Sequence, residues 1–237
     1  NELVKMESIT VIIKTSKGMK EYTYEGNLNI PVTTLLERIN VKHDIKIHYS
    51  SSCLQGLCGS CSMIINGLPK LACKTFVNEE ATTKKMHKIT IEPLSKFPVV
   101  NDLVVDRTSM FENIKNSRQW LEEESRINQD NLEFEYEASQ CLMCGCCLEA
   151  CPNYTGEDNY YGAILPVTSS KISKQESDMD KLKFLKENYS NHFYNDCVKS
   201  LACENVCPMN IQTQRAISIM NRHSIWKFHK LLKKITE

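Results

Sequence analysis

The chain has 237 residues, with 29 basic and 29 acidic side chains and a formal net charge of zero. This length suits two domains of ordinary size, and the balanced charge gives no indication of a nucleic-acid partner. No apolar run approaches the roughly 20 residues that a membrane-spanning helix needs, and no signal-peptide pattern is present, so we expect a soluble or peripheral protein.

The first hundred residues predict a small β-rich domain with one helix. Apolar and polar residues alternate on both sides of the turn at Ser16, Lys17 and Gly18, which is typical of a hairpin. An Asn66-Gly67 pair predicts a second hairpin turn. The predicted elements are strands over residues 8–14 and 20–24, a helix over 33–40, and strands over 63–65, 68–72 and 88–92. A small sheet with a helix packed across it is the β-grasp arrangement.

From about residue 103 onward the pattern changes to helix. Residues 110–124 mix apolar and charged positions without strand alternation, glycine or proline. Residues 211–234 form a basic, amphipathic pattern that predicts a helix docked on its own domain, with contact to a membrane partner as the alternative. The acidic stretch 122–137 is predicted to be an exposed connection, and the polar stretch 168–180 a loop.

The twelve cysteines limit the possible functions of the chain more than any other feature of the sequence. Four lie within residues 53–73 and five within 141–151. A disulfide framework is typical of secreted chains shorter than about 100 residues, and this chain is much longer. Clusters at such close spacing favour metal centres over disulfides.

The first cysteine cluster has the spacing of a plant-type [2Fe–2S] site. Cys53, Cys58 and Cys61 follow the pattern C-x4-C-x2-C, and Cys73 comes after the second predicted hairpin. Gly56 and Gly59 lie in this loop, where backbone amides must turn toward sulfur and a Cβ would obstruct them. A four-cysteine zinc site is the alternative, although zinc sites usually present two short cysteine pairs.

The remaining cysteines form two runs of identical spacing, which indicates a duplicated half-domain of the two-cluster ferredoxin type. The first run is Cys141, Cys144, Cys147, Cys151 and Pro152, and the second is Cys197, Ser200, Cys203, Cys207 and Pro208. In the bacterial pattern the fourth cysteine of each run ligates the other cluster.

Applied to these runs, the rule predicts two clusters of different type. A [4Fe–4S] cluster is held by Cys141, Cys144, Cys147 and Cys207. Cys151, Cys197 and Cys203 are three thiolates, which suits a [3Fe–4S] cluster, because Ser200 stands where a fourth cysteine is expected. Ligation of a fourth iron by Ser200 is the alternative. Cys146 is left over, and we expect it to be a small buried residue beside a cluster.

Three clusters in one chain predict a subunit that transfers electrons between two separate redox sites, since cluster potentials span a range of order 1 V. The predicted fold class is α+β. Residues 1–102 are expected to form an N-terminal β-grasp plant-type ferredoxin domain. Residues 103–237 are expected to form a C-terminal all-α, bacterial-ferredoxin-like domain with the [4Fe–4S] and [3Fe–4S] clusters.

The sequence resembles the iron–sulfur subunit of the succinate dehydrogenase / fumarate reductase family, with Gram-positive, menaquinone-type members most similar. The resemblance runs in order over nearly the whole chain and includes segments without cysteine. The matching segments are Ser52–Cys61, Ile65–Gly67, Leu71–Cys73, Phe97–Val100, Asp102–Leu103, Val105–Arg107, Cys141–Pro152 and Cys197–Pro208.

The resemblance implies a fixed division of labour. A separate flavoprotein with covalent FAD interconverts succinate and fumarate, and this subunit passes electrons through the [2Fe–2S], [4Fe–4S] and [3Fe–4S] clusters. A membrane anchor, often with haem b, presents quinone near the last cluster. The chain is then a non-substrate-binding subunit of a quinone oxidoreductase, peripheral on the cytoplasmic face of the bacterial cell membrane, and no catalytic side chain is predicted in it.

Two departures from the family bear on the quinone. Many ubiquinone-using members have tryptophan shortly after the position of Pro152 and histidine after that of Cys197. Here the corresponding residues are 153–156, which read Asn-Tyr-Thr-Gly, and Val198. Residues 93–98 also read like menaquinone users, so we expect a menaquinone-linked enzyme.

Two other functions compete with this interpretation. An iron–sulfur wire for a different flavoprotein, a thiol-linked fumarate reductase or a glycolate-type dehydrogenase, usually continues into Cys-Cys-Gly domains, and no cysteine follows Cys207 here. A zinc-dependent interaction module of the RING or LIM type requires complete four-ligand sites, and Ser200 breaks that count.

Overall fold

A computed structural model describes residues 7–83, 87–122, 124, 132–157 and 159–224. The chain divides into two compact units, each treated by itself below. Unit 1 comprises Asn1–Arg107 and Leu142–Glu149, and unit 2 comprises Thr108–Cys141 and Ala150–Glu237. Among the described helices, none has the length and apolar character needed to cross a membrane.

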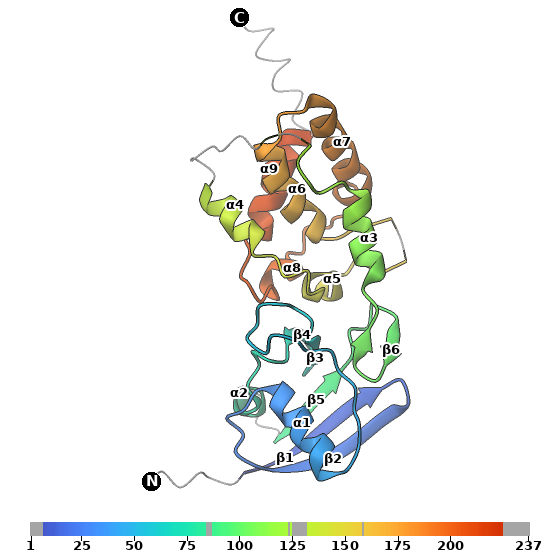
Figure 1. The fold of residues 1–237 in the computed structure, drawn as a ribbon, viewed down its shortest axis with the longest axis vertical. Coiled ribbons are helices and arrows are strands. Elements are labelled where there is room, and N and C mark those ends of the chain that lie inside the picture. Colours follow the sequence, from blue (N-terminus) through green and yellow to red (C-terminus); the bar gives the residue numbers. More distant parts are fainter. Residues whose placement is uncertain (1–6, 84–86, 123, 125–131, 158, 225–237) are drawn as a thin grey trace, which may run out of the picture. The chain divides into compact units, whose positions relative to one another are not determined.

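A five-stranded mixed sheet forms the body of unit 1 (Figure 1). Its strand order is β2-β1-β5-β3-β4, in which β1 pairs in parallel with β5 and the other neighbours are antiparallel. The strands are β1 (Glu7–Thr15), β2 (Gly18–Gly26), β3 (Ser62–Ile65), β4 (Leu68–Leu71) and β5 (Lys88–Glu92). Both predicted hairpins and the last predicted strand are confirmed.

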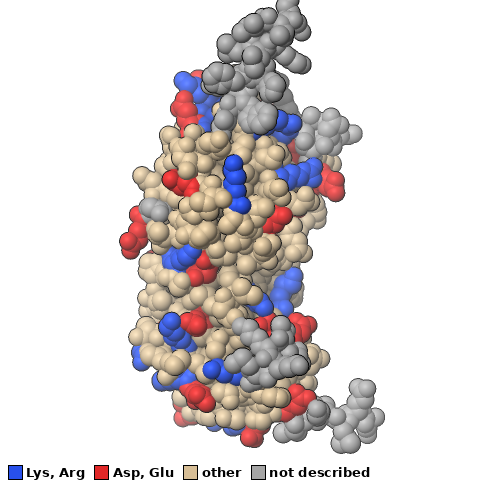
Figure 2. All heavy atoms as spheres, turned by 180° about the vertical axis from the view of Figure 1, so that it is seen from behind, with Lys and Arg blue, Asp and Glu red and all other residues tan. Residues whose placement is uncertain are grey.

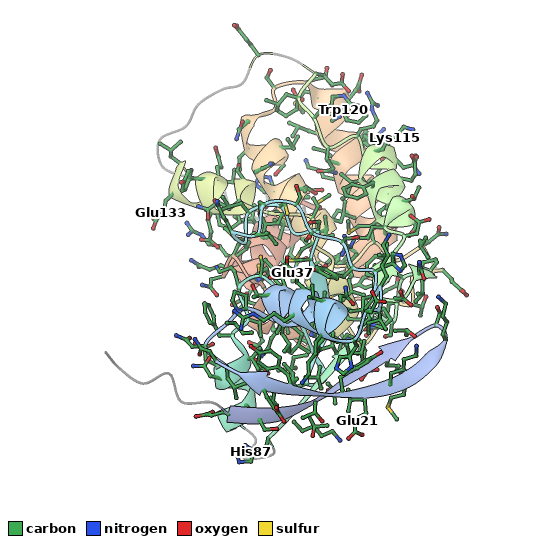
Figure 3. The ribbon with its side chains drawn as sticks, turned by 60° about the horizontal axis from the view of Figure 1, so that its bottom comes forward. Glu21, Glu37, His87, Lys115, Trp120 and Glu133 are labelled. Carbon is green, nitrogen blue, oxygen red and sulfur yellow. The ribbon has the colours of Figure 1, made fainter. Side chains whose placement is uncertain are left out.

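Helix α1 (Val32–Lys42) packs across one face of this sheet, as Figure 3 shows, with Glu37 on its outer side. Its apolar positions Leu35, Leu36 and Ile39 are buried against the inward-facing side chains of the sheet. The sheet contributes the alternate residues of β1 and β5, which are Ile9, Val11, Ile13, Ile89 and Ile91. Full burial of each such side chain stabilises the fold by about 1.5–3 kcal/mol. The predicted β-grasp arrangement is confirmed.

Shorter elements of unit 1 were not predicted from the sequence. They are α2 (Val77–Thr83), β6 (Val99–Asn101), β7 (Val104–Val105) and most of α5 (Cys146–Ala150). The tight β6–β7 turn places Asp102 at a left-handed φ of 48°. The Asp102 carboxylate accepts hydrogen bonds from the His48 backbone N–H at 3.0 Å and is 2.7 Å from the His48 ring Nδ1. This contact fixes the irregular segment that leads into the first cysteine loop.

Unit 2 is helical, as predicted. Its described helices are α3 (Thr108–Asn116), α4 (Leu132–Ser139), α6 (Ile164–Gln175), α7 (Met179–Tyr189), η2 (Ser190–Tyr194), α8 (Ala202–Asn205) and α9 (Thr213–Ser224). Their core includes Phe134, Val167 and Ile211, and the half-buried Cys141 and Cys207 pack against it.

The predicted loop over residues 168–180 is wrong, because α6 runs through Gln175 and buries its polar residues. The Thr168 hydroxyl donates to the Ile164 carbonyl at 2.9 Å, and the Ser170 hydroxyl donates to the Val167 carbonyl at 3.0 Å. Hydroxyls that bond back to the preceding turn can be buried inside a helix without an unsatisfied donor. A polar composition therefore did not exclude a core helix.

Two further boundaries differ from the predictions. Residues 132–137 were predicted to be part of an exposed connection, but α4 buries Phe134 and Ala138 in the core. The helix predicted over 110–124 ends at Asn116, and Arg118 adopts a left-handed φ of 49°. The helix predicted over 211–234 begins at Thr213, two residues later than predicted, and is described to Ser224; residues 225–234 lie outside the described residues.

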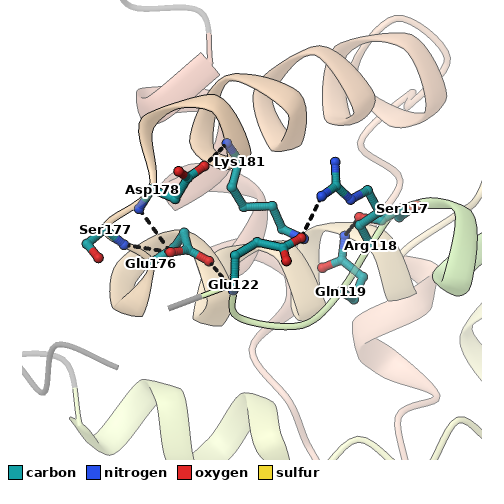
Figure 4. Close-up of polar contacts among 8 residues, drawn as sticks. All are labelled: Ser117, Arg118, Gln119, Glu122, Glu176, Ser177, Asp178 and Lys181. Atoms are coloured by element: carbon teal, nitrogen blue, oxygen red, sulfur yellow. Dashed lines mark hydrogen bonds and ion pairs between the residues drawn. The ribbon is translucent and has the colours of Figure 1, made fainter. Parts of the chain in front are cut away.

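The segment after α3 is held by ion pairs rather than by helix, as Figure 4 shows. Glu122 pairs with Arg118 at 2.6 Å and with the buried Lys181 ammonium at 3.2 Å. The Glu176 carboxylate accepts the Glu122 backbone N–H at 2.9 Å, and Lys181 lies 4.6 Å from the centre of the Trp120 ring. These contacts tie the connecting segment to the corner between α6 and α7.

Acidic and basic side chains are interspersed on the face that Figure 2 shows, without a large area of one sign. This pattern agrees with the formal net charge of zero.

Candidate iron–sulfur sites

All twelve cysteines lie within the described residues, and none of them forms a disulfide. Unit 1 contains the four cysteines of the first cluster together with Cys144, Cys146 and Cys147. Unit 2 contains the others, which are Cys141, Cys151, Cys197, Cys203 and Cys207.

The first cysteine loop follows α1 and leads into β3, and its backbone turns repeatedly toward sulfur. Leu54, Gly56 and Gly59 have left-handed φ values of 55°, 73° and 71°. As a result, the backbone N–H groups of Gln55 and Leu57 donate to the Cys53 sulfur at 3.4 and 3.2 Å. Amide donors directed at a thiolate stabilise its negative charge and tune a bound cluster.

Cys73 reaches this loop through the β3–β4 hairpin. Ser62 pairs with Leu71 in the antiparallel register, so the residues just outside the hairpin also lie opposite each other. The Ala72 N–H donates to the Cys61 carbonyl at 3.1 Å, and the Cys61 and Cys73 sulfurs are 3.3 Å apart. A hairpin of fixed register thus brings together two thiols that are twelve residues apart.

The thiols of this loop differ in acidity. A backbone hydrogen bond at Cys53, with a further one from the Ser60 hydroxyl, lowers the pKa of Cys58 to about 6. Burial, with the close Cys73 sulfur, raises the pKa of Cys61 to about 12. Buried thiols packed this closely resist ionisation unless a cation is bound, since each added thiolate repels the last. Bound iron would supply that positive charge.

A second loop of unit 1 carries Cys144, Cys146 and Cys147 at the start of α5. A hydrogen bond from the Cys146 thiol lowers the pKa of Cys144 to about 7. Cys146 is fully buried, and the same contact together with burial raises its pKa. The expected burial of Cys146 is confirmed. The four residues predicted to hold the [4Fe–4S] cluster are divided between the units, so that ligand set stays a prediction.

In unit 2, three thiols line one small cavity. Cys151 comes from the first cysteine run and Cys197 and Cys203 from the second, and Ser200 lines the same cavity. Lys199 and Leu201, on either side of Ser200, have left-handed φ values of 58° and 56°. The structure therefore places together the three residues predicted to hold the [3Fe–4S] cluster and the serine that replaces the fourth thiol.

Aromatic side chains complete this cavity. Tyr160 and Phe193 line it, with their ring centres 5.7 Å apart. The Cys151 thiol donates to the buried Tyr160 hydroxyl oxygen at 3.8 Å. Burial raises the pKa of Cys203 to about 11, and burial together with the nearby Cys151 and Cys197 raises the pKa of Tyr160. The phenol is therefore protonated near neutral pH and can act as a hydrogen-bond donor to sulfur.

The donor set fits iron–sulfur clusters. Thiols are soft ligands that suit iron–sulfur clusters, and they share their sites with polar groups within hydrogen-bond reach of sulfur, the Leu57 N–H in unit 1 and the Tyr160 hydroxyl in unit 2. Bound clusters would supply one-electron carriers, and the side chains around them would set the potential through hydrogen bonds, charge and burial.

Two domain models match the chain. A "2Fe-2S iron-sulfur cluster binding domain" matches residues 10–112, and a "4Fe-4S dicluster domain" matches residues 137–211. The two matches cover the two cysteine-rich regions described above.

Curated relatives extend over most of the chain. The succinate dehydrogenase iron–sulfur subunit of Bacillus subtilis is 30% identical over 218 residues, which cover 85% of this chain and 83% of that protein. The chain belongs to the succinate dehydrogenase / fumarate reductase iron–sulfur subunit family. The fumarate reductase iron–sulfur subunit of Wolinella succinogenes is 28% identical over 223 residues, covering 87% of this chain and 89% of that one.

A longer archaeal protein also matches this chain. An uncharacterized iron–sulfur protein of Methanocaldococcus jannaschii is 32% identical over 218 residues, covering 88% of this chain and 42% of that protein. Among solved structures, a chain of the Mycobacterium smegmatis Sdh1 complex in the apo form matches with a TM-score of 0.77 and 21% identity. That alignment covers 94% of this chain and 98% of the other, and it shows a shared fold.

Sequence patterns did not reveal several residues beside the thiols. Tyr160 lies outside both cysteine runs and reaches Cys151 only through the fold of unit 2. Arg107, in a segment predicted to carry no cofactor chemistry, contacts the first cysteine loop of unit 1. Both contacts depend on tertiary packing, so spacing within the sequence gave no signal for them.

Proposed function

We propose that this subunit relays electrons between a FAD-containing flavoprotein active on succinate or fumarate and membrane menaquinone. One observation carries the proposal beyond family membership. Three thiols from the two cysteine runs share one cavity with Ser200, which stands where the spacing predicts a fourth ligand. A chain that carries both a three-thiol site and a plant-type cysteine loop is suited to relaying electrons through clusters of different types.

The proposed ligands follow the cysteine patterns and their surroundings. Cys53, Cys58, Cys61 and Cys73 hold the [2Fe–2S] cluster, with the loop amides as donors. Cys151, Cys197 and Cys203 hold a [3Fe–4S] cluster, with the Tyr160 hydroxyl as a donor. The [4Fe–4S] cluster is assigned to Cys141, Cys144, Cys147 and Cys207 on the spacing rule.

Partner contacts are proposed at the first cysteine loop. Leu54 and Leu57 are 57% and 63% exposed there, and Cys53 and Cys58 are half-buried. Apolar side chains held open by a tight loop are suited to burial against a partner. We assign this face to the flavoprotein. A membrane anchor with quinone would complete the complex, on the cytoplasmic face of the bacterial cell membrane.

Substrate chemistry is assigned to the partner. The thiols and their hydrogen-bond donors are accounted for by cluster binding, so we propose no acid, base or nucleophile for succinate in this chain. The residues after Pro152 and Cys197 support menaquinone as the electron acceptor or donor, since Val198 occupies the position of the histidine typical of ubiquinone users.

The test is purification of the native complex from membranes under anaerobic conditions. We expect a copurifying flavoprotein with succinate–fumarate activity and about nine irons in this subunit. We also expect an EPR signal from an oxidised three-iron centre and faster turnover with menaquinone analogues than with ubiquinone analogues. A flavoprotein inactive on both acids would overturn the proposal, as would zinc in place of iron.

The archaeal relative supports a second candidate. Its 32% identity is comparable to that of the Bacillus subtilis subunit, and it is a longer protein. A related wire for a different flavoprotein, thiol-linked or glycolate-type, would use the same clusters. The same purification separates the two candidates, because only the first predicts turnover of succinate or fumarate without a thiol or glycolate substrate.

A further inference from the structure

Arg107 is the last residue of the first segment of unit 1, two residues after the end of β7. Its side chain is half-buried against the first cysteine loop. Its Nη2 donates to the Ser60 carbonyl at 3.3 Å and to the Ser62 hydroxyl oxygen at 2.6 Å. Both acceptors flank Cys61 in the sequence. The guanidinium is thus fixed beside the proposed [2Fe–2S] ligands by two hydrogen bonds.

The same contacts extend to the second cysteine loop of unit 1. The Ser62 hydroxyl donates in turn to the Cys144 carbonyl at 2.7 Å. Close packing at Gly59 confirms how near these loops lie, because a Cβ built there would be 2.8 Å from the Cys144 Cβ. Arg107, Ser62 and Cys144 therefore form a continuous hydrogen-bonded connection between two loops that carry thiols.

The charge of Arg107 faces sulfur from both loops. Burial lowers its pKa, and attraction to Cys144, Cys146, Cys61 and Cys58 acts in the opposite direction. Its Nε is also buried and has no hydrogen-bond partner among the described residues. A buried guanidinium donor without a partner is costly unless a further acceptor is present, and the sulfur of a bound cluster would be an acceptor of the right chemistry.

We propose that Arg107 is a positioning residue that bridges the two cysteine loops of unit 1 and raises the reduction potential of the [2Fe–2S] cluster. Reduction adds one negative charge, and a fixed, half-buried positive charge beside the ligands favours that state. The two hydrogen bonds hold the charge in place, so its effect does not depend on a mobile side chain. This inference rests on the cluster assignment of the proposed function.

The test compares Arg107→Gln with Arg107→Lys in the full chain with its clusters bound. Glutamine removes the charge and keeps a donor, whereas lysine keeps the charge and loses the planar fork. An EPR-monitored redox titration of the [2Fe–2S] signal is expected to show a lower midpoint potential for Arg107→Gln. A tenfold change in the one-electron equilibrium corresponds to about 59 mV. Arg107→Lys should retain most of the wild-type potential.

Arg38→Gln is the matched control in the same unit. Arg38 lies on α1 and donates to the Tyr24 hydroxyl rather than facing the thiols, so its replacement should leave the potential unchanged. An unshifted potential in Arg107→Gln with a full [2Fe–2S] signal would overturn the inference.

Loss of assembly is informative as well. Loss of the cluster in both Arg107 variants would assign the residue a structural role only and would equally overturn the inference. If only the Arg107→Gln variant fails to assemble the [2Fe–2S] cluster, the Arg107→Lys variant decides. A wild-type midpoint potential in Arg107→Lys supports the inference, and a shifted potential overturns it. Absence of the [2Fe–2S] signal from the wild-type chain would instead overturn the proposed function.

Discussion

The cysteine loop of unit 1 and the thiol-lined cavity of unit 2 gather sulfur in different ways. In unit 1, three thiols lie within nine residues of one loop, and the β3–β4 hairpin adds Cys73. In unit 2, Cys197 and Cys203 share one short segment, and only the helical fold brings Cys151, 46 residues before Cys197, to the same cavity. The hydrogen bonds at sulfur also differ, since backbone N–H groups donate to Cys53 in the first site and Cys151 pairs with a tyrosine hydroxyl in the second.

This difference separates local from tertiary control of a metal site. The unit 1 loop depends on backbone geometry that a short sequence encodes, including the left-handed residues Leu54, Gly56 and Gly59. The unit 2 cavity depends on side chains that distant segments contribute, so single substitutions there should change cluster type or potential. Four predictions test this contrast, from the largest expected effect to the smallest.

Cys73→Ser is expected to abolish the [2Fe–2S] cluster and with it electron transfer through the subunit. The substitution removes one of the two buried sulfurs that the hairpin holds 3.3 Å apart. Iron analysis should show a loss of about two irons per chain. The matched control is Cys146→Ser, which changes a fully buried cysteine that is not a proposed ligand and should retain all clusters. Equal iron loss in both variants would contradict the ligand assignment.

Ser200→Cys is expected to convert the three-iron centre into a [4Fe–4S] cluster. The new thiol would line the cavity that already contains three, which completes the four ligands of a cubane. The measurement is loss of the three-iron EPR signal of the oxidised protein and a gain of about one iron. Ser200→Ala is the control and should keep the wild-type signal. A loss of iron in Ser200→Ala would indicate that the serine oxygen is itself a ligand.

Gly59→Ala is expected to destabilise unit 1 by about 2–4 kcal/mol, as the sum of backbone strain and steric overlap. The new Cβ would be 2.8 Å from the Cys144 Cβ and 2.9 Å from the Leu142 carbonyl oxygen. Gly67→Ala provides a control, because its φ is also positive at 82° but no atom lies within 4 Å of the new Cβ. Chemical denaturation of the two variants separates the contribution of backbone strain from that of steric overlap. Equal destabilisation of both variants would exclude a contribution from steric overlap.

Tyr160→Phe is expected to lower the midpoint potential of the unit 2 cluster without loss of iron. The Tyr160 hydroxyl lies 3.8 Å from the Cys151 sulfur, which donates to it as a thiol. Once Cys151 ligates iron as a thiolate, the hydroxyl would be the donor, and such a bond strengthens when reduction adds negative charge. A shift of about 59 mV would correspond to a tenfold change in the one-electron equilibrium. Tyr161→Phe is the control, since the Tyr161 ring stacks on His192 instead. A wild-type potential in Tyr160→Phe would show that the hydroxyl does not affect the cluster and that the Tyr160 ring serves only in packing.

Much of unit 1 could be predicted from the sequence, because its elements depend on local patterns. Strand alternation, the Asn66-Gly67 turn and the spacing of Leu35, Leu36 and Ile39 act over a few residues. Unit 2 was harder. The polar stretch at 168–175 forms a buried helix because its hydroxyls bond to the preceding turn, and composition alone does not reveal that.

The sequence by itself determined the number and grouping of the cysteines, the duplicated run with Ser200 in place of a thiol, and the family. These properties are covalent or local, so they are readable before folding. Only the tertiary structure decided that Tyr160 reaches Cys151 and that Arg107 connects the Cys61 and Cys144 loops. Contacts between distant segments are fixed by packing of the core, which no spacing rule encodes.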